Sequence, residues 1–178
     1  MGPVSDNDME VDKMPEEAIK FEMTVSADNT YLPGMKTIMA DRGETHKVSY
    51  IPNIEYVKRP EETLHLQLLL PSGLLPGMFS EHTYPLVVYI QGAAWQEQEM
   101  YFNLPQLCMI ARQGFVVASV KHRSSQRAVF PAFLQDVKSA IRFLRANAKK
   151  YFINPDEVAV WGDSSGGNAA LLTGVTGD

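Results

Sequence analysis

The chain has 178 residues, a hydrophobic fraction of 45% and a net charge of −5, which predicts one globular domain with a sizeable core. It contains no long block of Lys or Arg, so the composition argues against nucleic acid or an anionic membrane as the main partner. The single cysteine, Cys108, excludes an internal disulfide and a multi-cysteine metal site, and we predict no metal centre.

Residues 1–45 have no clear hydrophobic period, and we expect an extension that is partly disordered or draped over the body. The opening residues are acidic and lack the apolar stretch of a secretory signal, and no run is long enough to cross a bilayer. These features predict a cytoplasmic protein. Residues 46–178 are predicted to form the folded domain.

From Val48 onward the pattern becomes regular. The segments VSYIPNIEYV and TLHLQLLLP alternate well enough to predict two antiparallel strands. YPLVVYIQG and FVVASVKH are continuous apolar runs, as in strands that are buried on both faces. Between them, NLPQLCMIARQG predicts a helix closed by Gly114.

The second helix is predicted to begin at Pro131, with its apolar residues on one face. These are Leu134, Val137, Ile141, Leu144, Ala148 and Tyr151. NPDE then predicts a turn, VAVW a third buried strand and SSGGNAALLTGV a last helix. Strands that alternate with helices after an antiparallel start indicate an α/β fold, with a mostly parallel sheet and helices on both faces.

The residues Gly162, Asp163, Ser164, Ser165 and Gly166 fit the pattern G-x-S-x-G. A predicted strand directly before the serine and a predicted helix directly after it are the context that a nucleophile turn requires. The glycines would let the two backbones pass closely, and the helix start would direct N–H groups at an oxyanion. A phosphate-binding turn is the alternative, but the sequence has neither a P-loop lysine nor a G-x-G-x-x-G.

A second loop agrees with this interpretation. After Ile90 the sequence continues as QGAAW, whose small residues 92–94 would let the backbone approach a bound carbonyl group closely. From about Tyr50 to the end, the chain resembles the α/β-hydrolase-fold esterases and lipases, particularly their carboxylesterase and feruloyl-esterase-like branch. The motifs that carry the resemblance are QGAAW, HRSSQRAVFPAFLQDVKSAIRFLRANA and INPDEVAVWGDSSGG.

The resemblance implies that Ser164 is the catalytic nucleophile and that the backbone N–H groups of Ala93, Ala94 and Ser165 form the oxyanion hole. Gln91 stands where the commoner HGGG opening has histidine. The methyl groups of the two alanines narrow the approach, which favours small acyl groups. This mechanism needs no cofactor.

Four further residues have assigned roles. Trp95 and Gln91 are candidates for substrate binding, and core packing is the alternative for Trp95. By the resemblance, Arg123 and Asp136 are structural, and we expect them to form an ion pair.

No residue in the expected place can serve as the base. In this fold the triad runs Ser, then Asp or Glu, then His along the chain. The four histidines are His46, His65, His82 and His122, and all precede Ser164. His122 follows a predicted strand and could substitute as base, but a packing role is the favoured interpretation.

The chain therefore looks like the N-terminal half of an α/β-hydrolase domain, truncated after the nucleophile strand and helix. In the family's sheet the nucleophile strand is central, so Val158–Trp161 would form an open apolar edge here. We expect a second chain, or a missing C-terminal half with the Asp and His, to lie against that edge.

The first hypothesis for function is a serine carboxylic-ester hydrolase that acts through an acyl-enzyme on a small-molecule ester. Short acyl groups are the expected substrates, with carbohydrate-linked acetyl or feruloyl esters as the candidates that the resemblance adds. The alternatives are a non-catalytic hydrolase-fold binding or interaction module and a peptidase of the same fold. This fragment alone is expected to be inactive, because removing the base from a triad costs about 10⁴–10⁶ in rate.

Overall fold

The computed structural model describes residues 47–177, so the predictions for residues 1–45 lie outside the described part of the chain. The strands are β1 Ser49–Lys58, β2 Thr63–Leu70, β3 Tyr84–Ile90, β4 Val116–Val120 and β5 Ile153–Gly162. The helices are the 3₁₀ turn η1 Pro71–Gly73 and the α-helices α1 Leu104–Ala111, α2 Ala132–Ala146 and α3 Ser164–Val175.

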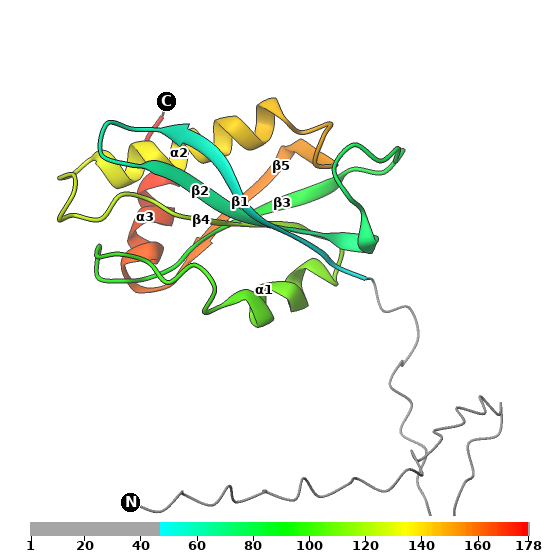
Figure 1. The fold of residues 1–178 in the computed structure, drawn as a ribbon, viewed down its shortest axis with the longest axis horizontal. Helices are drawn as coiled ribbons and strands as arrows, with labels where there is room; N and C mark the ends of the chain where they lie inside the picture. The colour runs from blue at the N-terminus through cyan, green and yellow to red at the C-terminus, as the bar shows by residue number, and fades with distance from the viewer. Residues whose placement is uncertain (1–46, 178) are drawn as a thin grey trace, which may run out of the picture. The chain divides into compact units, whose positions relative to one another are not determined.

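The strands form one sheet in the order β1-β2-β4-β3-β5 (Figure 1). β2 pairs antiparallel with β1 and with β4, whereas β3 pairs parallel with β4 and with β5. The antiparallel start and the parallel continuation agree with the prediction. Because β3, β4 and β5 are mutually parallel, their carboxyl ends meet at one edge of the sheet, where the loops after them can assemble a site.

Helices cover both faces of the sheet, as predicted. α2 and α3 contribute to the larger core cluster, which includes Leu66, Val88 and Val137. α1 lies on the opposite side (Figure 1) and packs Leu107 against Tyr89. The α/β fold class with helices on both faces is therefore confirmed, although the described sheet is mixed rather than mostly parallel, with two antiparallel and two parallel pairings.

The helices α1 and α2 follow most of their predicted patterns, but α2 ends at Ala146, so Ala148 and Tyr151 lie beyond the helix on whose face they were predicted. The apolar face of α2 is buried at Leu134, Val137, Ile141 and Leu144. α1 ends at Ala111, and Gly114 then takes a left-handed conformation with φ +91°. Glycine adopts that conformation without a steric penalty, so its role in closing this helix is explained.

Two predictions about the last strand are wrong. The segment NPDE is not a turn but part of β5, which begins at Ile153 and runs to Gly162. VAVW is not fully buried: Val158 and Val160 are half-buried, and Trp161 is 45% exposed. The reason is that β5 pairs only with β3 and forms an edge of the described sheet, which agrees with the open edge expected at Val158–Trp161. A run can thus be as apolar as a central strand and still be exposed when no neighbour covers it.

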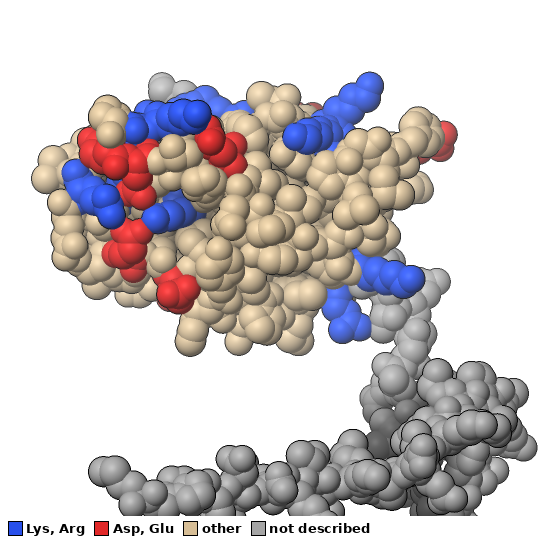
Figure 2. All heavy atoms as spheres, in the orientation of Figure 1, with Lys and Arg blue, Asp and Glu red and all other residues tan. Residues whose placement is uncertain are grey.

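Acidic and basic side chains lie interspersed at one end of the molecule (Figure 2). Lys121 Nζ is 3.1 Å from Glu62 and 2.5 Å from Glu97, and Arg127 Nε is 3.5 Å from Glu62. The charges in this network therefore balance one another. None of the helices within residues 47–177 combines the length and the apolar character that a membrane span requires.

Candidate active site

Ser164 lies on the sharp turn between β5 and α3. It is the first residue of α3, its side chain is exposed, and its φ is +48°, in the left-handed region that residues with a β-carbon rarely adopt. Strain of this kind is concentrated at functional sites, where the surrounding structure maintains it. The turn thus presents the hydroxyl at the carboxyl edge of the sheet, as the sequence predicts.

The glycines two residues before and after Ser164 are required by close backbone contacts. A β-carbon on Gly162 would lie 2.5 Å from the carbonyl carbon of Gly166. A β-carbon on Gly166 would lie only 2.0 Å from the carbonyl oxygen of Ile90, the last residue of β3. Both distances are well inside van der Waals contact, so neither position accepts a side chain without backbone movement.

The loop after β3 reaches the nucleophile turn. At Gly92 an added β-carbon would lie 2.4 Å from the carbonyl oxygen of Asp163 and 2.8 Å from Ser164 Cβ. The structure therefore brings the QGAAW loop and the predicted nucleophile, Ser164, together, although about seventy residues separate them in the chain. Only a glycine allows this approach.

Side chains on both sides of Ser164 bind the amides of this loop. The N–H of Gly92 donates to Asp163 Oδ1 over 3.1 Å. The N–H groups of Ala93 and Trp95 both donate to Ser165 Oγ, over 3.0 and 3.3 Å. The Ala93 amide, one of the predicted oxyanion donors, is thus occupied by the Ser165 hydroxyl.

The other two predicted oxyanion donors, the amides of Ala94 and Ser165, have no such acceptor in the described part of the chain. Within residues 47–177, no hydrogen bond runs from the amide of Ala94 or of Ser165 to another residue. Ser165 is the second residue of α3, where backbone N–H groups have no partner inside the helix. Neither amide is therefore committed to an acceptor within the described chain.

Asp163 has long-range contacts that the sequence did not indicate. Its Oδ1 accepts a hydrogen bond of 2.7 Å from Tyr89 Oη, and Tyr89 Oη accepts one from Asn103 Nδ2. Burial, together with the bond to the carboxylate, raises the pKa of Tyr89 far above its usual value, so Tyr89 remains a donor. A tyrosine in an apolar strand and an acid in the nucleophile turn were the available signals, but their contact depends on the fold.

His122 is a packing residue in this structure. It is 2% exposed, its Nδ1 lies 2.9 Å from the carbonyl oxygen of Arg123, and its ring packs against Phe133. Burial lowers its pKa, so the ring stays neutral. No hydrogen bond joins Ser164 to any of the three histidines that the structure describes, His65, His82 and His122.

The predicted ion pair between Arg123 and Asp136 is confirmed. Arg123 Nε and Nη2 donate to the two carboxylate oxygens over 2.9 and 3.0 Å, and the backbone N–H of Arg123 donates to Oδ2 over 3.1 Å. Asp136 is fully buried and also accepts from Arg59 Nε over 3.0 Å, which the sequence did not indicate. The pair fixes the start of the loop between β4 and α2 onto α2.

An apolar hollow of about 240 Å³ lies beside the QGAAW loop, between the β4–α2 loop and α3. It is lined by Trp95, Ser125, Ala128, Phe130, Phe133 and Asn168. Trp95, a predicted substrate contact, is therefore at its wall, and Asn168 is one helical turn beyond Ser164. Gln91, the other predicted contact, has a buried Oε1 without a hydrogen-bond partner in the described structure.

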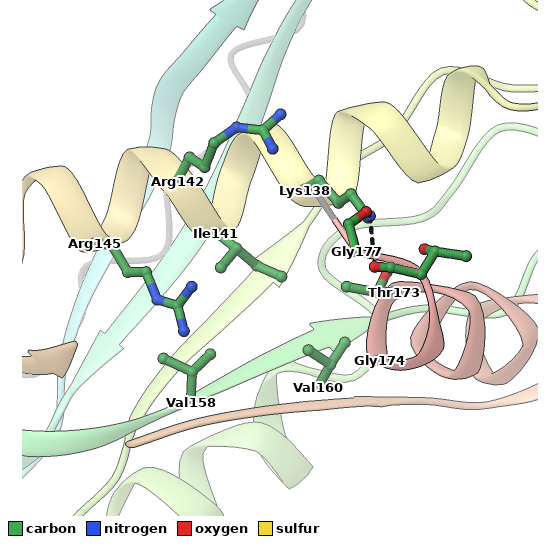
Figure 3. A pocket seen from close by; sticks show the side chains of 10 residues that line it. Lys138, Ile141, Arg142, Arg145, Val158, Val160, Thr173, Gly174 and Gly177 are labelled. Carbon is green, nitrogen blue, oxygen red and sulfur yellow. Dashed lines mark hydrogen bonds between the residues drawn. The ribbon is translucent and has the colours of Figure 1, made fainter. Parts of the chain in front are cut away.

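The open side of β5 borders a second cavity of about 330 Å³ (Figure 3). Val158 and Val160 form its apolar floor, and Lys138 and Arg145 extend over it from α2. Lys138 Nζ donates to the carbonyl oxygens of Thr176, over 2.8 Å, and Gly177. The cavity thus lies between α2, the edge strand and the end of α3.

Known esterases resemble this chain in sequence. It is 32% identical over 93 residues to the esterase LipC of Mycobacterium tuberculosis, covering 52% of this chain and 23% of the relative. It is 36% identical over 95 residues to neutral cholesterol ester hydrolase 1 of Rattus norvegicus, covering 49% and 23%. The chain thus spans about a quarter of the length of these curated relatives.

Solved structures agree on the fold. A truncated carbohydrate esterase from gut microbiota matches with a TM-score of 0.60 and 31% identity, over 75% of this chain and 45% of that one. A bifunctional GH43-CE protein of Bacteroides eggerthii matches with a TM-score of 0.58 and 37% identity, over 69% and 17%. The BD-FAE family model matches residues 74–178, which include both the QGAAW loop and the nucleophile turn. The chain belongs to the BD-FAE family.

Proposed function

We propose that the protein is a serine carboxylic-ester hydrolase that acts through an acyl-enzyme. Ser164 Oγ attacks the ester carbonyl carbon while a base accepts its proton; the bond to the alcohol oxygen then breaks, and the alcohol leaves with that proton. Water attacks the acyl-enzyme in turn, releasing the acid and restoring Ser164. One observation carries the proposal: the exposed Ser164 lies on a strained turn beside the available amides of Ala94 and Ser165.

The base and its orienting carboxylate are assigned to polypeptide beyond the described residues. We expect this polypeptide, a continuation of the chain or a second chain, to pair with β5 along Val158–Trp161. Three features support this: the other side of β5 has no strand partner among residues 47–177, its side chains are partly exposed, and a cavity runs alongside (Figure 3).

The proposed substrates are esters with short acyl groups. The hollow next to Trp95 is apolar and small, and the rings of Phe130 and Phe133 line it, so it suits a short chain or one ring. The similarity to a carbohydrate esterase from gut microbiota adds carbohydrate-linked acetyl or feruloyl esters as candidates.

The test is active-site labelling of the polypeptide that carries both this chain and the base. A fluorophosphonate should modify Ser164, identified by peptide mass spectrometry, and Ser164→Ala should abolish both labelling and hydrolysis of nitrophenyl acetate. Ser72→Ala is the matched control, because Ser72 is another exposed serine with a positive φ and its replacement should leave the labelling of Ser164 unchanged. Labelling that persists in Ser164→Ala, or a complete enzyme that is never labelled, would contradict the proposal.

A non-catalytic binding module remains the second candidate, because none of the described histidines is hydrogen-bonded to Ser164. The two functions predict different results with nitrophenyl acetate. An esterase gains turnover when the missing base is supplied by the longer polypeptide, whereas a binding module stays inactive in both forms.

A further inference from the structure

The QGAAW loop holds a conformation that its own residues do not favour. Ala94 and Trp95 have φ of +49° and +59°, and the N–H of Gln96 donates to the carbonyl oxygen of Ala93 over 2.8 Å. A four-residue turn with two left-handed central residues normally contains glycine or asparagine at those positions. Residues with a β-carbon keep such a conformation only when surrounding contacts enforce it.

Those contacts come from the two residues that flank the nucleophile. Asp163 Oδ1 accepts the amide of Gly92, at the entry to the turn, over 3.1 Å. Ser165 Oγ accepts the amides of Ala93 and Trp95 over 3.0 and 3.3 Å, and Ser165 is only 5% exposed. Three of the four loop amides from 92 to 95 are therefore bound by side chains of the nucleophile turn.

Asp163 is itself held in place. Tyr89 Oη donates to the same Oδ1 over 2.7 Å, and Asn103, the residue before α1, donates to Tyr89 Oη. The Asp163 side chain makes no capping hydrogen bond to α3. Its contacts are thus directed at β3 and the loop rather than at its own helix.

We infer that Asp163 and Ser165 are positioning residues that set the QGAAW loop against Ser164, and that Ala94 rather than Ala93 supplies the loop's N–H to the oxyanion. The role in catalysis rests on the proposed esterase function, whereas the hydrogen bonds belong to the fold. The amide of Ala94 is the one between 92 and 95 that donates to no other residue of the described chain. It can therefore bind a substrate oxygen without first breaking an internal bond.

The positioning role of Asp163 requires an oxygen that accepts hydrogen bonds and does not require its negative charge. Asp163→Asn keeps an oxygen that can accept from Tyr89 and Gly92, whereas Asp163→Ala keeps none. Ser165→Thr keeps the hydroxyl, whereas Ser165→Ala loses it. Each alanine variant thus has a conservative partner that should preserve the loop.

Residue-resolved amide exchange by NMR on this chain tests the arrangement without any turnover. In the parent, the amides of Gly92, Ala93 and Trp95 should exchange roughly tenfold more slowly than that of Ala94, after correction for intrinsic rates. Asp163→Ala should accelerate exchange at Gly92, and Ser165→Ala should accelerate it at Ala93 and Trp95. The asparagine and threonine variants should retain most of the protection.

A protected Ala94 amide, or an unprotected Ala93 amide in the parent, would overturn the inference even if the protein proved to be an esterase. In the polypeptide that carries the base, Asp163→Ala and Ser165→Ala should lower kcat roughly tenfold or more with little change in KM, because the oxyanion donor is misplaced in the transition state. Equal losses in the asparagine and threonine variants would contradict a role through hydrogen bonding. If the exchange pattern holds but every form is inactive, the loop assignment stands and the esterase proposal fails.

Discussion

Gly166 lies so close to Ile90 that a β-carbon on the glycine would be 2.0 Å from the isoleucine carbonyl oxygen. This contact brings α3 against the end of β3, from which the QGAAW loop departs. The spacing of the G-x-S-x-G motif thus has a packing cause that is separate from the chemistry of the serine.

The contact predicts a large loss of stability in Gly166→Ala. Because both sides of the contact are backbone, we expect the free energy of unfolding to fall by about 3 kcal/mol. Gly174→Ala is the control in the same helix: nothing lies within 4 Å of the added β-carbon, so stability should rise by about 0.5 kcal/mol. Urea denaturation measures both. A Gly166→Ala protein as stable as the parent would show that the two backbones are farther apart.

Replacing Ser164 should reveal the strain of its turn. Ser164 has φ +48°, which glycine adopts at no steric cost. The free energy gained by removing the strained β-carbon exceeds the free energy lost because glycine makes the unfolded chain more flexible. Ser164→Gly should therefore be about 0.5–1 kcal/mol more stable than Ser164→Ala. Chemical denaturation of the two variants compares two inactive proteins directly. A less stable glycine variant would argue against a left-handed Ser164.

The ion pair of Asp136 is buried, so its loss should be severe. Asp136→Ala leaves the buried Arg123 guanidinium without its main partner, and we expect a loss of about 3–5 kcal/mol. Glu55→Ala is the comparison, because its pair with Lys58 is exposed and should contribute less than about 1 kcal/mol. Thermal unfolding of both variants distinguishes the cases, and equal effects would contradict the buried arrangement.

His122 should make the fold sensitive to acid. Burial lowers its pKa below the ordinary value of 6.5, so the unfolded chain binds a proton at a pH where the folded chain does not. Stability from this group is therefore complete above about pH 6.5 and is lost as the pH falls from there toward the lower, folded pKa. His122→Gln does not titrate, so its stability should depend less on pH between 7.5 and 5.5. Parallel pH profiles of the two proteins would be inconsistent with a neutral, buried His122.

The exposed edge of β5 should lead to self-association of this chain. At high concentration, light scattering should give a mass above the 19.9 kDa of one chain. Ala159→Lys places a charge on the exposed part of β5 and should restore the monomer. Glu55→Gln, in the edge strand β1 on the other side of the sheet, changes the net charge by the same amount and should have no effect. A parent protein that stays monomeric at every concentration would argue against self-association through the edge of β5.

Much of the fold follows from local patterns in the sequence. The continuous apolar runs at β3 and β4 are typical of strands that are buried on both faces. The apolar residues of α2 recur with the spacing of one helix face, at Leu134, Val137, Ile141 and Leu144. The nucleophile turn was found in the same way, because its five residues are contiguous and its glycines follow from local geometry. Residue spacing is sufficient to predict an element when the contacts that stabilise it join residues close together in the sequence.

The tertiary structure alone decided what depends on strand order. An apolar run does not indicate whether a second neighbour covers it, so the pattern of VAVW alone predicted a buried strand, and only the family's strand order indicated the open edge that β5 forms. The amide of Ala93 was assigned from the sequence to the oxyanion, but the fold brings Ser165 Oγ to it across 72 residues. Hydrogen-bond partners so far apart are set by the pairing of β3 with β5, and no local pattern encodes that register. The sequence therefore identified the candidate nucleophile and its loop, whereas the packing of the sheet determined which of the loop's amides donates to no other described residue.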